Sequence, residues 1–479
     1  MITRGAVGSV LVLLGGLVTQ VLPWSSPMAD APLLGTMRES TTGRMIGLVV
    51  VVAGLALLGS AWLQLLRATH PNTGLPTGQR LKTVHVAALS WSAPLLLAPP
   101  LFSRDGWSYA AQGALTHIGL SPYIWTPSIF DGQIREGVDP LWLNTLTPYG
   151  PLPLAWGSFV AGITDNPWLM VVGYRVLALV GLAILARAVP RLARATGQDV
   201  ARASALVIAC PLTIAQGVGG VHNDLIMAAL MAAALAVALD HSWVLGAVLA
   251  GAAAAVKVPG GVVAIGVALV SLPLLAGLFP RLRRLTAVGA VAVAVLVGSG
   301  ALIGVGTGWI HALGTPGIVR TPLSLTTQVG VLLGHVDGHA LAIVRTLGLA
   351  VAAALVAWFA LRGRTGDRAS AVRTTANLAT AVVLLGPAVH GWYLLWALPF
   401  LAACAWGPPI DALVRDAALL LGIIAPLDSS LRGAPTEIIV VAALVIATAI
   451  RLRLSHREPQ AAPPQAGVPQ RLSGSSLAP

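Results

Sequence analysis

Long apolar stretches recur from one end of this chain to the other, and they restrict its possible folds more than any other feature. The 479-residue sequence is 56% hydrophobic and only 10% charged, whereas soluble domains carry about 25% charged residues. A run of about 20 apolar residues spans a bilayer when it is helical. The pattern therefore predicts an all-α polytopic membrane protein with no separate soluble domain.

Apolar runs of suitable length predict about 13–14 transmembrane helices. The first run has some features of a signal peptide, but its length favours a retained helix. The expected spans are 5–22, 45–66, 83–102, 168–186, 203–217, 224–239, 243–257, 259–276, 285–306, 341–361, 375–389, 392–406, 411–426 and 436–451.

The loops between these runs alternate in charge, as the positive-inside rule requires. We therefore place the basic loops, and with them both termini, in the cytoplasm of a plasma (inner) membrane protein. The net charge of +12 is then explained by topology, and no nucleic-acid partner is expected. The basic loops are 67–82, 187–202, 280–284, 362–373 and the segment from 451; the outer segments are 24–44, 103–150, 218–223, 307–340, a turn at 390 and 427–434.

The domain organisation follows from this topology. Residues 1–455 form one transmembrane domain, with a large first external loop at 103–150 and a second external loop at 307–340. The tail at 456–479 is rich in Pro, Gln, Ser and Gly, a composition that predicts a disordered cytoplasmic segment.

The external loop 103–150 begins with an acid directly after an apolar run. Acids are costly near hydrocarbon, at about 2.5–3.5 kcal/mol at a helix centre, and usually serve a function there. If the segment after Asp105 is helical, Tyr109 and Gln112 share a face with it. Asp105 can then accept a proton from an acceptor hydroxyl. The alternative is an interfacial acid paired with Arg104.

Two further polar groups interrupt apolar runs on the same outer side. His222, Asn223 and Asp224 are consecutive and suit hydrogen bonding to sugar hydroxyls, although Asn and Asp at this place can also be helix caps. Lys257 precedes the helix-breaking Pro259; a cation in such a place favours a functional site with a lipid phosphate as its partner. The alternative is a lysine that snorkels to the headgroups.

The remaining candidates lie in the later outer segments. Arg320 offers a planar fork for a phosphate, and His390, Trp392 and Tyr393 are either belt residues or rings that stack on a sugar. His335 and His339 are four residues apart, but no acid cluster completes a metal site. Two cysteines lie far apart in apolar runs and are interpreted as small core side chains: Cys210 and Cys404.

Several motifs in this order resemble the polyprenol-phosphomannose-dependent α-1,6-mannosyltransferases of actinobacterial cell envelopes, which build lipomannan and lipoarabinomannan backbones. The resemblance covers most of residues 80–400. The matching motifs are FSRDGWSYAAQGAL (102–115), GLSPY (119–123), VDPLW (138–142), TPYGP (147–151), GGVHNDLIM (219–227), AVKVPGG (255–261) and GWYLLW (391–396).

The resemblance implies a class C glycosyltransferase fold and an inverting transfer of mannose from polyprenyl-phosphate-mannose to a mannan glycolipid. By this resemblance Asp105 is the general base, and Lys257, Arg320 and His222 bind the donor phosphate. No metal or other cofactor is expected, because a phosphate leaves without one. The implied sugar and acceptor ligands are Arg104, Tyr109, Tyr149, Asn223, Asp224, His390, Trp392 and Tyr393.

A multi-helix transporter or flippase of a lipid-linked sugar is the main alternative. Such a protein would also have many helices, broken segments and a lysine in an apolar run. Transporters often contain inverted repeats with sites at the bilayer midplane. The sequence contains no convincing repeat, and its polar groups gather at one membrane face instead, which favours the transferase.

Overall fold

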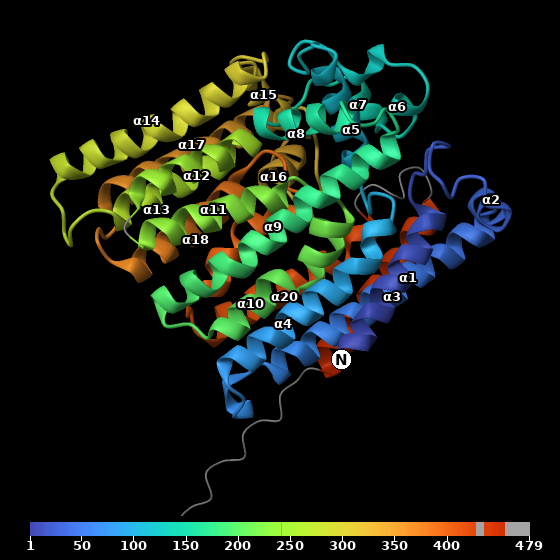
Figure 1. The fold of residues 1–479 in the computed structure, drawn as a ribbon, viewed down its shortest axis with the longest axis horizontal. Helices are drawn as coiled ribbons and strands as arrows, with labels where there is room; N and C mark the ends of the chain where they lie inside the picture. The colour runs from blue at the N-terminus through green and yellow to red at the C-terminus, as the bar shows by residue number, and fades with distance from the viewer. Residues whose placement is uncertain (241, 428–434, 456–479) are drawn as a thin grey trace, which may run out of the picture.

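The computed structural model describes residues 1–240, 242–427 and 435–455. It is 75% helical, with no strand among these residues (Figure 1), so the all-α polytopic class is confirmed. The predicted tail at 456–479 and most of the predicted outer turn at 427–434 lie outside the described residues.

Every predicted span coincides with helical structure, but few spans are single long helices. In the described residues, five helices are long and apolar enough to cross a membrane, or six if one bent pair counts as a span. Shorter apolar helices make up the rest of the bundle, so the predicted count of about 13–14 transmembrane helices stays a prediction. The five are α1 (Ile2–Thr19), α3 (Thr41–Ala68), α9 (Pro167–Thr196), α14 (Leu278–Leu302) and α17 (Ala340–Arg362); the pair is α10 (Val200–Ile208) with the π-helix η4 (Leu212–Gly219).

The other spans are short or broken, and most breaks occur at proline. Pro94 lies where α4 passes into a 3-10 turn, Pro211 lies in the 45° bend before η4, and Pro259 follows α12. Proline lacks the N–H that the helix ladder needs. The elements concerned are α4 (Thr77–Ser92), η2 (Ala93–Leu97), α11 (Asp224–Leu239), α12 (Trp243–Val256), η5 (Val258–Val262), α13 (Val263–Val270), α18 (Arg368–Leu385), η7 (Gly391–Trp396), α19 (Leu398–Ala403), α20 (Pro408–Ile423), η8 (Ala425–Leu427) and α21 (Pro435–Ser455).

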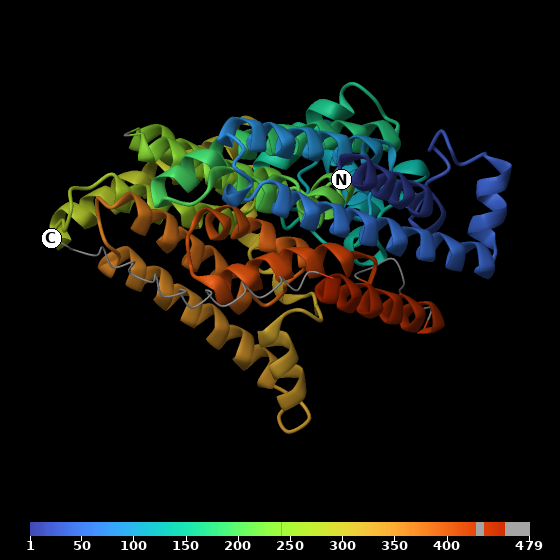
Figure 2. The same cartoon turned by 90° about the horizontal axis from the view of Figure 1, so that it is seen from below.

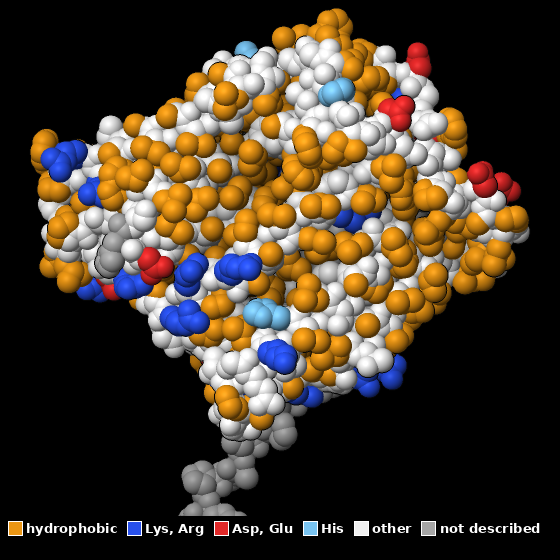
Figure 3. Space-filling model, in the orientation of Figure 1, with side chains coloured by type: hydrophobic (Ala, Val, Ile, Leu, Met, Phe, Trp, Pro, Cys, Tyr) orange, Lys and Arg blue, Asp and Glu red, His pale blue; other side chains and the backbone are white. Residues whose placement is uncertain are grey.

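The predicted external segments are folded and helical. In Figure 1, α5 to α8 and α15 lie at the upper end of the bundle. Figure 3 shows most of the visible acids toward that end and most Lys and Arg side chains toward the opposite end. The short elements in and next to these segments are α2 (Pro32–Glu39), α5 (Asp105–His117), η3 (Pro127–Ile129), α6 (Gln133–Glu136), α7 (Pro140–Leu143), α8 (Pro151–Ala161), α15 (Trp309–Ala312), η6 (Thr315–Gly317) and α16 (Leu325–Leu333). A further short element, η1 (Pro71–Thr73), lies in the predicted cytoplasmic loop 67–82.

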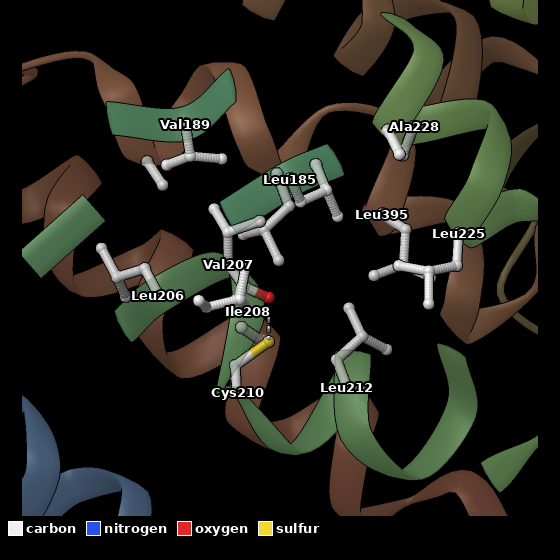
Figure 4. Close-up of a cluster of buried hydrophobic side chains, with 14 of the residues drawn as sticks. Leu185, Val189, Leu206, Val207, Ile208, Cys210, Leu212, Leu225, Ala228 and Leu395 are labelled. Atoms are coloured by element: carbon white, nitrogen blue, oxygen red, sulfur yellow. Dashed lines mark hydrogen bonds between the residues drawn. The ribbon is translucent and has the colours of Figure 1, made fainter. Parts of the chain in front are cut away.

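The centre of the bundle is a close-packed apolar core around α9, α10 and α11. Figure 4 shows Leu185 of α9, Val207 of α10 and Leu225 of α11 in one cluster of buried side chains that also contains Cys210. Cys210 and Cys404 are both buried, as expected for small core side chains. This packing holds the bend between α10 and η4, and through it the polar segment at 220–224.

Helices α1 and α3 lie side by side (Figure 2), and glycines form their contact. A Cβ on Gly54 would lie 2.6 Å from the carbonyl oxygen of Gly8, and one on Gly15 would lie 2.5 Å from that of Gly47. Membrane helices lack a hydrophobic drive toward one another, so close approach at small residues supplies much of their attraction. These glycines therefore set the distance between the two helices.

We expect Gly54→Val to destabilise the protein by about 1–3 kcal/mol, because the added methyl groups meet backbone that cannot rotate away. Gly289→Val in α14 is the matched control, since a Cβ there meets nothing within 4 Å. Thermal unfolding of both variants in detergent, followed by tryptophan fluorescence, measures the difference. Equal midpoints would show that the α1–α3 contact is not tight.

Candidate active site

Two irregular backbone segments meet where the external loop begins. The N–H of Leu101 donates to the carbonyl of Gly219 at 3.1 Å. Phe102 and Val221 have φ of 65° and 61°, values that L-residues rarely adopt and that often accompany functional sites. Asp105 follows the first of these residues and His222 the second, so the joined segments bring the two side chains together.

Asp105 is the first residue of α5, and its carboxylate faces His222 and Tyr109. The distance from Oδ2 to His222 Nδ1 is 3.5 Å, and the Tyr109 hydroxyl donates to Oδ2 at 3.4 Å. The Asp105 side chain is 13% exposed. Among the described ion pairs Asp105 is joined to His222 and not to Arg104, so the interpretation as an Arg104-paired surface acid is wrong.

The surroundings of Asp105 favour its ionised form. Burial by itself raises the pKa of this carboxyl, but the hydrogen bond and charge of His222 and the charges of His390 and Lys257 outweigh burial and lower the pKa. Asp105 is therefore a carboxylate at neutral pH. A carboxylate can accept a proton from a neighbouring hydroxyl.

Behind Asp105, three rings from two segments form a stack. The imidazole of His222 lies 3.7 Å from the Trp392 ring and the imidazole of His390 lies 4.3 Å from it, both measured between ring centroids. His222 is only 2% exposed. The stack holds His222 against Asp105 and joins the turn before α11 to η7.

Lys257 lies at the end of α12 and is paired inside the protein. Its Nζ is 3.2 Å from Oδ1 of Asp224, which also accepts a hydrogen bond from Trp396 Nε1 at 2.7 Å. The ammonium lies 4.1 Å from the centroid of the Tyr393 ring, a cation–π contact. Lys257 is 7% exposed. The snorkelling interpretation is therefore wrong. The ammonium is paired with a carboxylate inside the protein, and its predicted contact with a lipid phosphate stays a prediction.

Asn223 and Asp224 lie at the start of α11, yet they do not act as helix caps. Asn223 is the N-cap residue but makes no side-chain cap hydrogen bond. Asp224 is fully buried, and one of its oxygens holds Lys257. The capping interpretation therefore does not describe this turn, because the acid points into the bundle.

A pair of tyrosines connects Asp105 to Lys257. The hydroxyls of Tyr109 and Tyr149 are 2.9 Å apart, and Lys257 Nζ lies 5.5 Å from the centroid of the Tyr149 ring. The N–H of Gly150 donates to the carbonyl of Val256 at 2.9 Å. The end of the external loop is thus fixed to the residue before Lys257.

Asp105 and Lys257 line one cavity of about 50 Å³. A second cavity of about 260 Å³ shares Tyr149, Lys257 and Tyr393 with the first. Its far wall is apolar and comes from α15, α17 and α18, with Trp309, Leu313, Leu349 and Val382. The arrangement combines a carboxylate and a cation at one end with an apolar chamber leading away from the cation.

The structure brings most, but not all, of the predicted residues together. Arg320 is exposed and lines neither cavity, although its neighbour Val319 does. Arg104 lines neither cavity and is half-buried at the N-cap of α5. The predicted residues that line a cavity are Asp105, Tyr149, Lys257, His390, Trp392 and Tyr393; those behind the wall are Tyr109, His222, Asn223 and Asp224.

The predicted site residues leave out three tryptophans that lie at the site. Trp396 holds Asp224, and Trp142 and Trp309 line the cavities. All three stand inside segments that the sequence had already marked, but indoles are common at membrane interfaces and gave no separate signal. Among the described residues, no three metal-binding side chains gather; His335 and His339 are exposed.

Comparisons with known proteins place this arrangement in a family. The family described as alpha-(1->6)-mannopyranosyltransferase, N-terminal domain, matches residues 2–273, and the MptB C-terminal domain matches residues 321–454. Asp105, His222 and Lys257 lie in the first match, and His390 and Trp392 lie in the second. The site is therefore built from both matched regions.

Curated relatives are similar in sequence to this protein over most of its length. A probable alpha-(1->6)-mannopyranosyltransferase of Mycolicibacterium smegmatis is 32% identical over 97% of this chain and 91% of its own length. Alpha-(1->6)-mannopyranosyltransferase A of Mycobacterium tuberculosis is 33% identical over 84% and 79%. Alpha-(1->6)-mannopyranosyltransferase B of Corynebacterium glutamicum is 28% identical over 84% and 72%.

The fold and these comparisons together identify a polytopic membrane glycosyltransferase. The chain belongs to the alpha-(1->6)-mannopyranosyltransferase family, which confirms the resemblance seen in its motifs.

We expect substitutions of Asp224 and Lys257 to have non-additive effects on the free energy of unfolding. Asp224→Asn leaves Lys257 as an unpaired buried cation while keeping an acceptor for Trp396, so it should destabilise the protein by about 3–5 kcal/mol. The double variant Asp224→Asn/Lys257→Met removes both charges and should recover much of that loss. Unfolding midpoints in detergent test this; a double variant as unstable as Asp224→Asn would contradict the coupling.

Proposed function

We propose that this protein transfers mannose from polyprenyl-phosphate-mannose to an α-1,6-mannan glycolipid with inversion at the anomeric carbon. The observation that carries the proposal is that Asp105 and Lys257 line the same cavity. The names of the curated relatives support the sugar and the linkage. A general base and a leaving-group cation are the two groups that such a displacement requires.

The second cavity suits the lipid part of the donor. Its apolar wall from α15, α17 and α18 begins beside Lys257. A prenyl chain in this chamber would leave its phosphate beside the lysine. The Lys257 ammonium donates one hydrogen bond to Oδ1 of Asp224, and a lysine ammonium carries three N–H donors. Lys257 can therefore hold a phosphate while Asp224 keeps it in place.

The reaction needs one base and one leaving group. The 6-hydroxyl of the acceptor loses its proton to the Asp105 carboxylate as its oxygen bonds to the anomeric carbon of mannose. The bond from that carbon to the phosphate oxygen breaks, and its electron pair leaves with polyprenyl phosphate. Lys257 stabilises the charge that develops on the phosphate. Tyr109 and His222 position the carboxylate through the contacts described above.

The roles of His222 and Arg320 in the proposal differ. His222 was expected to bind the donor phosphate, but it stacks behind Trp392 and touches Asp105, a place that supports a positioning role. Arg320 lies beside Val319 of the cavity wall and stays a prediction as a second phosphate ligand. Trp142 and His390 are half-buried in the cavity wall, where their rings suit an acceptor sugar.

The proposal places the reaction on the outer face of the plasma membrane, with both termini in the cytoplasm. The support is the distribution of charge: Arg and Lys concentrate toward the end of the bundle opposite the 103–150 loop (Figure 3). Positive residues mark cytoplasmic loops. A mannan acceptor would then approach the cavity from the aqueous outer side.

We expect Asp105→Asn to lower mannosyl transfer by about 10²–10⁴-fold, the usual contribution of a general base. Membrane vesicles containing the variant are incubated with labelled polyprenyl-phosphate-mannose and a short α-1,6-mannoside, and chain extension is followed. Asp131→Asn is the control, because this acid of the same loop is 99% exposed and should keep full activity. Wild-type transfer by Asp105→Asn would exclude the base assignment.

The same assay tests whether a metal takes part. We expect no loss of transfer after treatment with EDTA, because the phosphate leaving group can be stabilised by Lys257. Addition of Mg²⁺ or Mn²⁺ to treated vesicles is the control. A loss that either ion restores would mean that a metal shares the phosphate.

A further inference from the structure

A polar cavity of about 560 Å³ lies away from the two cavities of the active site. It is formed where the end of α3, the start of α10 and helix α20 come together. Three arginines and a histidine line it, and none of its described lining residues is an acid. The residues that the argument uses are Arg67, His70, Arg202, Arg415, Leu66 and Leu206.

A buried arginine outside the cavity holds its walls in position. Arg80 is 5% exposed and pairs with Asp199 at 2.9 Å. It also donates to the carbonyl of Thr69 at 2.8 Å. Asp199 in turn accepts from the N–H of Arg202 at 2.8 Å and caps α10. The turn after α3 and the first turn of α10 are thus fixed to one side chain, so the space between them is part of the built structure.

The histidine in the wall presents a donor. His70 Nδ1 accepts a hydrogen bond from the N–H of Asn72 at 3.2 Å. A nitrogen that accepts carries no proton, so the proton of the neutral ring is on Nε2. The carbonyl of His70 accepts from the Thr73 hydroxyl at 2.8 Å, which fixes the turn further. His70 therefore adds an N–H donor to the cationic wall.

Arg415 carries more donors than its neighbour uses. Arg415 binds the adjacent Asp416 through Nε and Nη2, each at 2.9 Å. A guanidinium has five N–H groups, so donors of Arg415 remain. Arg202 contributes its guanidinium from the first turn of α10. Planar forks of this kind match the oxygens of a phosphate.

We propose that this cavity binds the phosphate group of an anionic glycerophospholipid. Leu66 and Leu206 form part of its wall, and apolar helices continue from it into the bundle, which suits the glycerol and acyl part of a lipid. Basic pockets between membrane helices are common sites for anionic headgroups. The site lies at the basic end of the bundle, opposite the 103–150 loop, and is independent of the transfer reaction. Free phosphate has the same chemistry as the headgroup, so the test must separate the two.

The test uses the full-length protein in detergent, with phosphatidylglycerol and phosphatidylcholine as probes and native mass spectrometry as the measurement. Arg67→Gln/Arg202→Gln should bind phosphatidylglycerol about tenfold or more weakly than the wild type, since each basic residue contributes about 1 kcal/mol. Arg187→Gln/Arg194→Gln is the matched control. It removes the same charge from exposed positions of α9 and should bind like the wild type.

A charge-conserving variant and a competition experiment separate a lipid site from a site for free phosphate. Arg67→Lys/Arg202→Lys keeps the charge and should retain part of the binding, and thermal unfolding checks that each variant is folded. Competition by inorganic phosphate without any preference for phosphatidylglycerol over phosphatidylcholine would keep the phosphate site but exclude a lipid as its source. Equal losses in the Arg67/Arg202 and Arg187/Arg194 variants, or none in either, would overturn the proposal.

Discussion

The ion pair between Lys257 and Asp224 is the interaction on which the site depends. A buried charge inside an apolar bundle is tolerated only when a partner satisfies it. Asp224, Trp396 and the ring of Tyr393 surround the ammonium, and these side chains come from α11 and η7. This ion pair, with the Trp396 hydrogen bond, fixes three segments relative to one another: the turn after η4, the end of α12 and η7. The cavity that holds Asp105 is the space left between them.

Broken helices make this arrangement possible. A continuous span satisfies its own backbone and turns only side chains toward its neighbours, whereas a broken one frees polar backbone that must be bonded elsewhere. The pairs Leu101–Gly219 and Gly150–Val256 are such bonds. Each links the chain at one end of the external loop, just before it at Leu101 or at its last residue Gly150, to an interruption in the bundle. Proline at the breaks and strained φ at Phe102 and Val221 are thus features of the site.

Motif reasoning found the parts of the site but not all of their contacts. Asp105 and Lys257 were predicted as charges that are costly in apolar surroundings, and Trp392 as either a belt residue or a ring that stacks on a sugar. All three line the cavity. The pairing of Lys257 with Asp224 was not predicted, because consecutive polar residues at a helix start look the same whether they cap the helix or point into the bundle. Arg320 was grouped with them by chemistry alone, and its exposed position depends on how the 307–340 segment folds.

The sequence by itself determined the membrane class, the positions of the helical segments and the family, because hydrophobic runs and short motifs are local properties of a chain. Only the tertiary structure decided how many spans are continuous, which acid neutralises Lys257 and which rings enclose it. Those outcomes depend on packing between segments more than 30 residues apart, such as Asp224 with Lys257 and Trp396. No local pattern encodes such pairings, since burial and the choice of partner arise only when the helices are assembled.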